Sequence, residues 1–560
     1  MRLSKVLTIF GFSLLLSAAG IAAERSAAFR IEDRVENRVD DRLFGQFLEI
    51  ASWGEPGPEA LVEPKSGRLP PPIVEKLRDL RAPVIRFPGG IDIDYLDWTD
   101  RIDNAPQRAP GAPRPVSRTR GNELTNRFGY DEFLALAATL NSDPLLVVNL
   151  RRSLEPGADV AAAAEHAAAL VAYCNAVPTD TRLDPAMREW AELRQANGHK
   201  APWRVRYWQV GNETWNYLAE VAEKNGLRDA ETIGRWYVDR LVAYAEAMRR
   251  VDSELVLIAD GWYIDEAVRD QILTDPRLGR HYDYYALHTY APGGPVRLYR
   301  DGEPIEPDAV SREELWYAWV GMPGHFSEGR VYAKGPGAFV GEPRLGWAIT
   351  EWNWNGWGAG IQQHGRLATI AQGVGAAGYL NAMIRHGDHL QLATQSMMLG
   401  VSWNIAAVEA DADAEHEPFL TPSGATTALY TQYHGDRRLA VTPLGATPEV
   451  TRNLTLVGWG RHDATEPLPL IDTVVTRSDD RLFLHVLQRS LTDAISLRFD
   501  LSSLAMDSES ATVRQLRPRH DRGVAPRDVL SLIEQQHPMS EGVLTIELVP
   551  QTVSIIEIAL

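Results

Sequence analysis

Eight short apolar segments, each followed by a helical stretch, constrain the fold of this chain more than any other feature. The predicted strands span 43–50, 83–90, 144–150, 205–213, 255–261, 283–290, 346–352 and 390–396. The predicted helices between them include 131–140, 159–175, 230–251 and 365–386. Regular alternation of this kind predicts a (β/α)₈ barrel. A doubly wound sheet is the competing architecture, but it does not by itself explain polar residues at the C-terminal end of every strand.

The pattern changes to strands alone after His434. Residues 470–490 predict two strands joined at Asp479 and Asp480, and residues 494–501 alternate apolar and polar side chains. We therefore predict an α/β chain, a TIM barrel with a C-terminal β-sandwich. The predicted domains are a signal peptide (1–23), an N-terminal strand that joins the sandwich (24–42), the catalytic barrel (43–435) and the sandwich itself (436–560).

The first residues are typical of export. Arg2 and Lys5 precede an apolar run, and small residues follow it before Glu24, which is the order found in a signal peptide. We expect a secreted or periplasmic protein. Its one cysteine, Cys174, lies on a predicted helix and is expected to be a buried thiol. The formal net charge of −18 argues against nucleic-acid or anionic-membrane partners.

Two carboxylates fall at strand ends of the predicted barrel. Glu213 ends the fourth strand in "VRYWQVGNE", and Glu351 ends the seventh in "WAITEW". Glycoside hydrolysis needs two carboxyl groups that flank the scissile bond, and barrel enzymes place catalytic groups at these strand ends. Each residue alone is more typical of a solvated surface glutamate. Together, they predict a glycoside hydrolase in which one carboxyl group donates a proton and the other attacks the sugar or activates water.

Tryptophans surround both carboxylates in the sequence. Trp352 and nearby aromatic residues suit a platform for the apolar face of a sugar, although at least one is expected in the core. The aromatic residues concerned are Trp208, Trp215, Trp352, Trp354 and Trp357.

At this point the chain resembles the α-L-arabinofuranosidases of glycoside hydrolase family 51, within clan A. The tripeptide "GNE" ending the fourth strand and a glutamate ending the seventh resemble the retaining (β/α)₈ glycosidases of that clan, so the resemblance implies a retaining mechanism. The motifs that resemble the family more narrowly are "LFGQFLE" (43–49), "IRFPGG" (85–90), "NRFGYDEFLALA" (126–137), "LLVVNL" (145–150), "ALHTY" (286–290), "YLNAMIRHGD" (379–388) and "LATQS" (392–396).

The resemblance implies roles for individual residues. Glu213 corresponds to the acid/base and Glu351 to the nucleophile. Arg86 and Tyr290 correspond to groups that orient the nucleophile. The predicted substrate-binding residues are Glu49, Arg86, Asn212, Tyr290, Gln395, His288 and Trp352. No cofactor and no metal are implied, and the expected partner is a carbohydrate.

Two departures from the family pattern concern specificity. Ile91 stands where the family usually has an asparagine that binds the arabinose, and a hydrocarbon side chain cannot replace that hydrogen bond. Arg151 and Arg152 follow "VVNL", where the family has small residues. If they faced the pocket, they could bind a uronate or sulfate, although surface ion pairs are the favoured interpretation.

Two short motifs suggest cofactors but lie in unsuitable places. "GVGAAG" (373–378) fits a dinucleotide pattern, but it falls inside a predicted helix rather than at a strand-to-helix turn. "HGDH" (386–389) lies at a helix end without complementary metal ligands.

The favoured function is an exo-acting α-L-arabinofuranosidase on plant-type polysaccharides or oligosaccharides. The alternatives are a clan A glycosidase on another sugar, such as a β-glucuronide, a β-xyloside or an algal galactan, and a carbohydrate-binding barrel without turnover.

Overall fold

A computed structural model gives the fold of the chain. It describes residues 25–560 except 51–54, 64–65, 106–112, 114, 119–120, 122, 263, 292–296, 322–335, 337–344, 355–369, 402–404, 412, 414, 458–460, 465–466, 505, 507 and 520–529. The predicted signal peptide lies outside the described residues. Among the described residues, none of the helices combines the length and the apolar character that crossing a bilayer requires.

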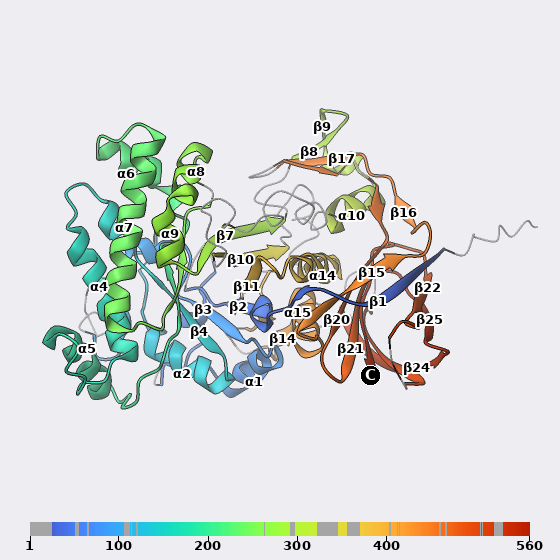
Figure 1. Cartoon of the computed structure of the whole chain (residues 1–560), viewed down its shortest axis with the longest axis horizontal. Coiled ribbons are helices and arrows are strands. Elements are labelled where there is room, and N and C mark those ends of the chain that lie inside the picture. Colours follow the sequence, from blue (N-terminus) through green and yellow to red (C-terminus); the bar gives the residue numbers. More distant parts are fainter. Residues whose placement is uncertain are drawn as a thin grey trace, which may run out of the picture.

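Within the described residues, eight parallel strands close into a barrel (Figure 1). In chain order the strands are β2 (Gly45–Phe47), β3 (Val84–Phe87), β4 (Asp143–Val148), β5 (Tyr207–Val210), β6 (Val256–Ala259), β7 (Tyr284–Ala291), β10 (Gly346–Trp354) and β11 (Leu390–Ser396). Each strand pairs with its neighbour in the chain, and β11 pairs with β2. The predicted barrel is confirmed, and the doubly wound alternative is excluded because the sheet has no free edge.

Alternation along the strands produces two cores. One set of side chains fills the barrel interior, and the other packs beneath the surrounding helices, as a closed parallel barrel requires. The interior set includes Val84, Leu145, Val147, Ile258, Ala348 and Leu392. Their chain neighbours, such as Ile85 and Leu146, belong to the larger core under the helices.

The helices that cover the barrel begin at clear signals. Asp159 accepts a hydrogen bond from the amide of Ala162, and Asp229 accepts one from the amide of Thr232, so each caps a helix. The helices are α1 (Pro71–Asp79), α2 (Tyr130–Leu140), α3 (Arg151–Leu154), α4 (Val160–Asn175), α5 (Pro185–Ala196), α6 (Leu218–Lys224), α7 (Ala230–Val251), α8 (Glu266–Thr274), α9 (Pro276–His281), α10 (Arg312–Val320), α14 (Ile370–Arg385) and α15 (Pro422–Gln432). Cys174 is buried on α4, as predicted.

The C-terminal region forms a second, all-β unit. Its strands are ordered β1 (Ser26–Arg38), β15 (Arg437–Pro443), β20 (Ile471–Arg477), β21 (Arg481–Gln488), β26 (Thr552–Ala559), β23 (Ser510–Pro518), β24 (Leu530–Ser540), β25 (Val543–Leu548) and β22 (Ile495–Asp500), and β22 pairs back with β1. Figure 1 shows β1, drawn in blue, among the orange and red strands of this unit. It pairs antiparallel with β15 and parallel with β22.

The barrel and the β unit are in contact, and their boundary includes partly buried ion pairs. In Figure 1, α14 and α15 lie between the barrel and the β unit. Asp472 on β20 binds Arg385 of α14 and also Arg489, whose Nη2 lies 2.9 Å from the carboxylate. A small sheet joins β8 (Arg297–Arg300) and β9 (Glu303–Ile305) to β17 (Leu454–Val457) and β18 (Arg461–Ala464). Shorter strands are β12 (Leu399–Gly400), β13 (Val408–Glu409), β14 (Phe419–Leu420), β16 (Glu449–Val450) and β19 (Leu468–Pro469).

Candidate active site

The two predicted catalytic carboxylates lie at the C-terminal ends of β5 and β10. Glu213 lies three residues after the end of β5, and Glu351 lies within β10, three residues before its end. The register of β10 against β7 shifts between Ile349 and Glu351, so that Glu351 lies opposite His288. This one-residue irregularity directs Thr350 and Glu351 toward the same histidine, as β-bulges beside active sites commonly do.

Glu351 is held by two donors from other strands. Arg86 Nη1 on β3 donates to its Oε1 at 3.0 Å, and the Tyr290 hydroxyl on β7 donates to its Oε2 at 2.7 Å. Arg86 is fully buried, and its Nε donates to Gln209 Oε1 at 2.9 Å. Arg86 and Tyr290 thereby fix the position of the Glu351 carboxyl group, as the attack of a nucleophile requires.

Glu213 has a different setting. Its backbone is left-handed, with φ 48° and ψ 42°, and its side chain is 20% exposed. Asn216 Nδ2 on η6 (Thr214–Asn216) donates to its Oε2 at 3.1 Å. Burial raises the pKa of Glu213 to about 7, while Asn216 and the more distant Arg86 oppose that rise. A carboxyl that keeps its proton near neutral pH suits a general acid.

His288 connects the two carboxylates. Its Nδ1 lies 2.9 Å from Glu213 Oε1 and 3.5 Å from Glu351 Oε2, and its Nε2 lies 3.1 Å from Thr350 Oγ1. Burial lowers the pKa of His288 to about 4, so the imidazole is neutral at neutral pH. A carboxylate oxygen of Glu213, one of Glu351 and a ring nitrogen of His288 all lie within 4.8 Å of one another. The two carboxyl groups therefore belong to one cluster of side chains.

Asn212 and Glu49 complete the polar surroundings. Arg86 Nη2 donates to Asn212 Oδ1, whereas Asn212 Nδ2 is buried and has no hydrogen-bond partner among the described residues. Glu49 is buried, and its carboxylate lies against Gly90, where a Cβ would come within 1.6 Å of Glu49 Oε1. Gly90 has φ +67°, so both its backbone and the adjacent carboxylate require glycine.

Two predicted site residues lie elsewhere. The prediction for Gln395 is wrong, because its carbonyl accepts hydrogen bonds from Gln46 at 3.0 Å and from Thr427 of α15 at 2.8 Å, outside the barrel. The prediction for Trp352 is also wrong: it is fully buried, and its ring centroid lies 5.4 Å from that of Tyr379 on α14. In both cases strand alternation turns the side chain toward the helices.

The other described tryptophans divide between the core and the neighbourhood of His288. Trp208 and Trp354 are fully buried, and Trp354 stacks on Trp319 with centroids 4.4 Å apart. Trp215 is half-buried, and its ring meets that of His288 edge-on at 5.3 Å. Among the predicted tryptophans in the described part of the chain, Trp215 is thus the one whose ring contacts His288. Trp357 lies outside the described residues.

The two arginines after β4 form local ion pairs. Arg151 is enclosed between the rings of Tyr95 and Tyr217, with its Cζ 4.5 and 4.6 Å from their centroids, and it binds Glu155 at 2.7 Å. Arg152 Nη1 lies 3.1 Å from Asp97 Oδ2. The Arg152 side chain is 50% exposed, so its pair is the surface ion pair that the sequence favoured, whereas the Arg151 side chain is only 12% exposed and its pair is not a surface one. Ile91 begins η3 (Ile91–Tyr95) and is half-buried.

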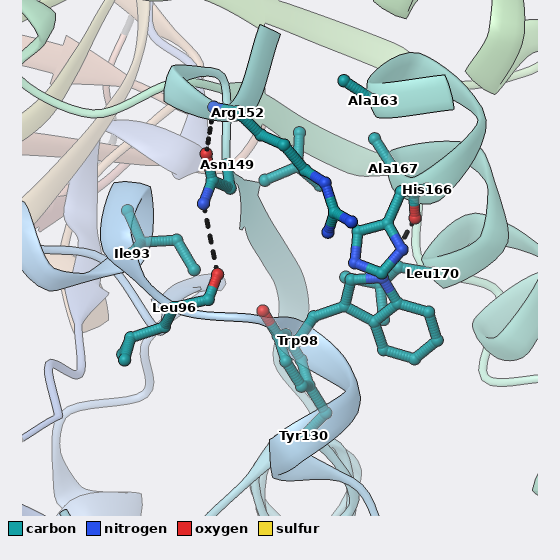
Figure 2. Close-up of a pocket in the computed structure, with 11 residues that line it drawn as sticks. Ile93, Leu96, Trp98, Tyr130, Asn149, Arg152, Ala163, His166, Ala167 and Leu170 are labelled. Carbon is teal, nitrogen blue, oxygen red and sulfur yellow. Dashed lines mark hydrogen bonds between the residues drawn. The ribbon is translucent and has the colours of Figure 1, made fainter. Parts of the chain in front are cut away.

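A separate small cavity lies beside β4, between η3 and α4 (Figure 2). Arg152 and His166 border it, and Asn149 bridges Leu96 O and the amide of Arg152. Its lining is Ile93, Leu96, Trp98, Tyr130, Val148, Asn149, Arg152, Ala163, His166, Ala167 and Leu170. It contains neither catalytic carboxylate.

Two of the three groups of possible metal ligands among the described residues have contacts that oppose a bound cation. The cluster of Glu213, His288 and Glu351 has a guanidinium 3.0 Å from one carboxylate, which opposes a cation there. A second group joins Asp103, Asp131 and His199, but the amide of Asp103 and the hydroxyl of Tyr173 already donate to Asp131. "GVGAAG" lies inside α14, where all six residues are buried, rather than at a turn that could hold a pyrophosphate.

Three buried polar residues of the site were not predicted from the sequence. Gln209 precedes the strand end and accepts from Arg86. Asp94 and Asp260 accept hydrogen bonds from the main chain on either side of Glu213. The position of Asp260 directly after β6 is a signal that sequence reasoning could have used, since it is the strand-end placement that identified Glu213.

A parallel barrel with two carboxyl groups meeting at its C-terminal end is an arrangement that glycoside hydrolysis can use. Residues 76–296 of this chain match the family model described as the alpha-L-arabinofuranosidase 1 domain. The resemblance inferred from the sequence motifs is thereby confirmed.

Individual relatives carry the same name. A probable α-L-arabinofuranosidase C from Aspergillus terreus is 32% identical over 190 residues, which are 34% of this chain and 32% of the relative. An intracellular exo-α-(1→5)-L-arabinofuranosidase from Bacillus subtilis is 28% identical over 267 residues, 45% of this chain and 46% of the relative. The chain thus spans about a third to a half of the length of these curated relatives.

Solved structures extend the likeness of fold to nearly the whole chain. An α-L-arabinofuranosidase from Thermotoga maritima, in complex with arabinose, has a TM-score of 0.69 and 19% identity, and the match covers 96% of this chain and 100% of that one. A family 51 enzyme from Bifidobacterium longum has a TM-score of 0.71 and 17% identity, covering 95% and 99%. At this identity the likeness establishes the barrel and β unit as a shared fold.

Proposed function

We propose that this protein is a retaining, exo-acting α-L-arabinofuranosidase. The observation that carries the proposal is the meeting of Glu213 and Glu351 through His288, with carboxylate oxygens within 4.8 Å. Retaining glycosidases hold their two carboxyl groups about 5–5.5 Å apart, whereas inverting enzymes leave about 6.5–9.5 Å for a water molecule. The short separation supports double displacement.

In the first step, Glu351 attacks the anomeric carbon while Glu213 gives its proton to the leaving oxygen. The bond from the sugar to the leaving group breaks as the bond to Glu351 forms. In the second step, the ionised Glu213 takes a proton from water, and the water oxygen displaces Glu351. The raised pKa of Glu213 suits the first role, and the donors on Glu351 suit a carboxylate that leaves as an anion.

The substrate contacts follow from the polar groups around the pair. Asn212 Nδ2, buried without a partner among the described residues, is available to a sugar hydroxyl next to the reacting carbon. Glu49 supplies a second polar contact, and Trp215 supplies an apolar face on the acid/base side. Arabinofuranosides are the proposed substrate because the matched family model and the named relatives are arabinofuranosidases.

The test is a panel of aryl α-L-arabinofuranoside, β-D-xyloside, β-D-glucuronide and β-D-galactoside substrates with wild type, Glu213→Ala and Glu351→Ala. We expect turnover of the arabinofuranoside and its loss in Glu351→Ala. Proton NMR of the early product should show a retained anomeric configuration. Inversion would exclude Glu351 as the nucleophile, and saturable binding without release on the whole panel would favour a carbohydrate-binding barrel.

We also propose that the protein is exported. The support is the charged, apolar and small-residue order of residues 1–23. Expression of the full chain in a bacterial host, followed by N-terminal sequencing of the periplasmic or medium fraction, should show cleavage near Ala19 to Ala23. Retention of an uncleaved chain in the cytoplasm would contradict export.

A further inference from the structure

The backbone at Glu213 is held from both sides by buried carboxylates. Glu213 is left-handed, a conformation that costs a non-glycine residue energy and persists only where neighbouring contacts impose it. The amide of the preceding residue, Asn212, donates to Asp94 Oδ2 at 3.1 Å. The amide of the following residue, Thr214, donates to Asp260 Oδ2 at 2.9 Å.

Asp94 joins three loops at the mouth of the barrel. It lies in η3 after β3 and is 2% exposed. Its Oδ1 accepts from the amide of Leu150 at 2.8 Å, after β4, and its Oδ2 accepts from the hydroxyl of Tyr217 at 2.7 Å, after β5. The amide of Arg151 lies 3.5 Å from Oδ1. Both carboxylate oxygens are therefore needed.

Asp260 uses one oxygen only. It is fully buried after β6, and its Oδ2 accepts from both the amide and the Oγ1 of Thr214, at 2.9 and 2.8 Å. Its Oδ1 has no hydrogen-bond partner among the described residues. Tyr237 of α7 supports the same contact, because its hydroxyl lies 2.9 Å from Thr214 Oγ1 and donates to Asp260 O at 3.0 Å.

We propose that Asp94 and Asp260 are positioning residues that clamp the acid/base Glu213 in its left-handed conformation and so aim its proton at the leaving group. This inference rests on the proposed function, because it assumes that Glu213 is the acid/base. Neither aspartate touches Glu351 in the contacts of the described residues. The clamp should therefore affect proton donation rather than nucleophilic attack.

Leaving-group dependence separates positioning from a purely structural role. A substrate with a poor leaving group needs the proton of Glu213, whereas a 2,4-dinitrophenyl glycoside does not. Loss of stability alone lowers the amount of active protein and reduces both rates equally. A displaced Glu213 reduces only the rate on the substrate with the poor leaving group. The value of kcat/KM measures the first displacement, in which the leaving group departs, and does not depend on the second displacement.

Asp94→Asn and Asp260→Asn form a matched pair. An asparagine has one acceptor oxygen, so it can replace the single working oxygen of Asp260 but not both oxygens of Asp94. For Asp94→Asn we expect kcat/KM on an unsubstituted phenyl arabinofuranoside to fall about 10- to 100-fold, the scale of an ångström-sized misplacement. On the dinitrophenyl substrate the fall should be about threefold or less. Asp260→Asn should lose less than Asp260→Ala.

The control is Asp131→Asn, which changes another buried aspartate that accepts from a main-chain amide and a tyrosine hydroxyl. It should lower the unfolding temperature without changing the ratio of the two rates. Should Asp94→Asn not fold, Tyr217→Phe and Thr214→Val each remove one hydroxyl contact to the clamp and should raise the same ratio. Equal losses on both substrates in the folded variants would overturn the clamp. An inactive wild type would instead overturn the proposed function.

Discussion

The ends of β5 and β10 present the same functional group in two opposite ways. At β10, Glu351 lies in a regular strand apart from one register shift, and donors from other strands, Arg86 and Tyr290, hold its side chain. At β5, the chain has already left the strand, and Glu213 is oriented through its backbone, between the main-chain contacts of Asn212 and Thr214.

The difference corresponds to the two proposed roles. A nucleophile must be held in a fixed position, which a guanidinium and a phenol achieve through hydrogen bonds to its side chain. A general acid must keep its proton, so strong donors to its oxygens would be harmful, and the backbone provides the positioning instead. His288 lies between Glu213 and Glu351. Burial lowers its pKa to about 4, so the imidazole is neutral and adds no charge beside either carboxyl group.

The largest expected effect is the loss of the carboxylate on the β10 side. Glu351→Ala should reduce kcat/KM on every aryl arabinofuranoside by roughly 10⁴- to 10⁶-fold, the scale seen when a nucleophile is removed. The reduction should not depend on the leaving group, because no substitute bond to the anomeric carbon can form. Initial rates with phenyl and dinitrophenyl substrates measure this. A reduction confined to the phenyl substrate would reverse the two assignments.

Removal of Arg86 tests whether side-chain contacts hold Glu351. Arg86→Ala leaves Glu351, Gln209 and Asn212 without a shared buried partner. We expect about 3–5 kcal/mol lower stability and a loss of roughly 10²- to 10³-fold in kcat. Urea unfolding and steady-state kinetics measure the two effects.

The matched control for that change is Arg194→Ala. This guanidinium is also fully buried, but it donates to the carbonyl oxygens of Tyr173 and Ala176 at 2.8 and 2.9 Å. The Arg194→Ala variant should be less stable than wild type, and its folded fraction should keep full activity. If both variants lost only stability, Arg86 would have no specific role at the nucleophile.

Loss of the β5 carboxylate should be selective. Glu213→Ala should lower kcat/KM on the phenyl substrate by roughly 10²- to 10⁴-fold, the usual contribution of general acid catalysis. The dinitrophenyl substrate should lose far less. Azide, which needs no base, should restore turnover of the glycosyl enzyme and give a glycosyl azide that thin-layer chromatography detects. Uniform loss without azide rescue would contradict the acid/base role.

The sequence contained enough information to predict the barrel and its carboxylate pair. Strand periodicity and strand-end glutamates are local signals, and closure of the sheet brings Glu213 and Glu351 together whatever the loops do. The fold class and the family resemblance were confirmed for that reason. The β unit followed from the same kind of signal, because its strands alternate buried and exposed residues.

The predictions of site residues were wrong where the direction in which a side chain points decides its role. Gln395 and Trp352 occupy adjacent strands and pair with each other across the sheet, yet both point outward. The register shift at Thr350 is not visible in the sequence, and it changes which side chains after it face the barrel interior. Asp94 was missed because its contacts come from three loops whose meeting depends on the closed barrel.

The smallest expected effect concerns the protonation of Glu213. The protonated form is the active acid, and its pKa is raised to about 7, so kcat/KM should fall as the pH rises through about 7. Asn216 Nδ2 donates to Glu213 Oε2 and favours the ionised form. Asn216→Ala should therefore move this alkaline limb to higher pH, by about one unit or less.

Asn225→Ala is the matched control, because this amide ends α6 and donates to the carbonyl oxygens of Leu154 and Val221 instead. Its alkaline limb should coincide with that of wild type. A limb that stayed in place in Asn216→Ala would mean that a different group limits activity at high pH. A limb that moved to lower pH would mean that Asn216 favours the protonated carboxyl. The surroundings of Glu213 and Glu351 would then differ even more than their hydrogen bonds indicate.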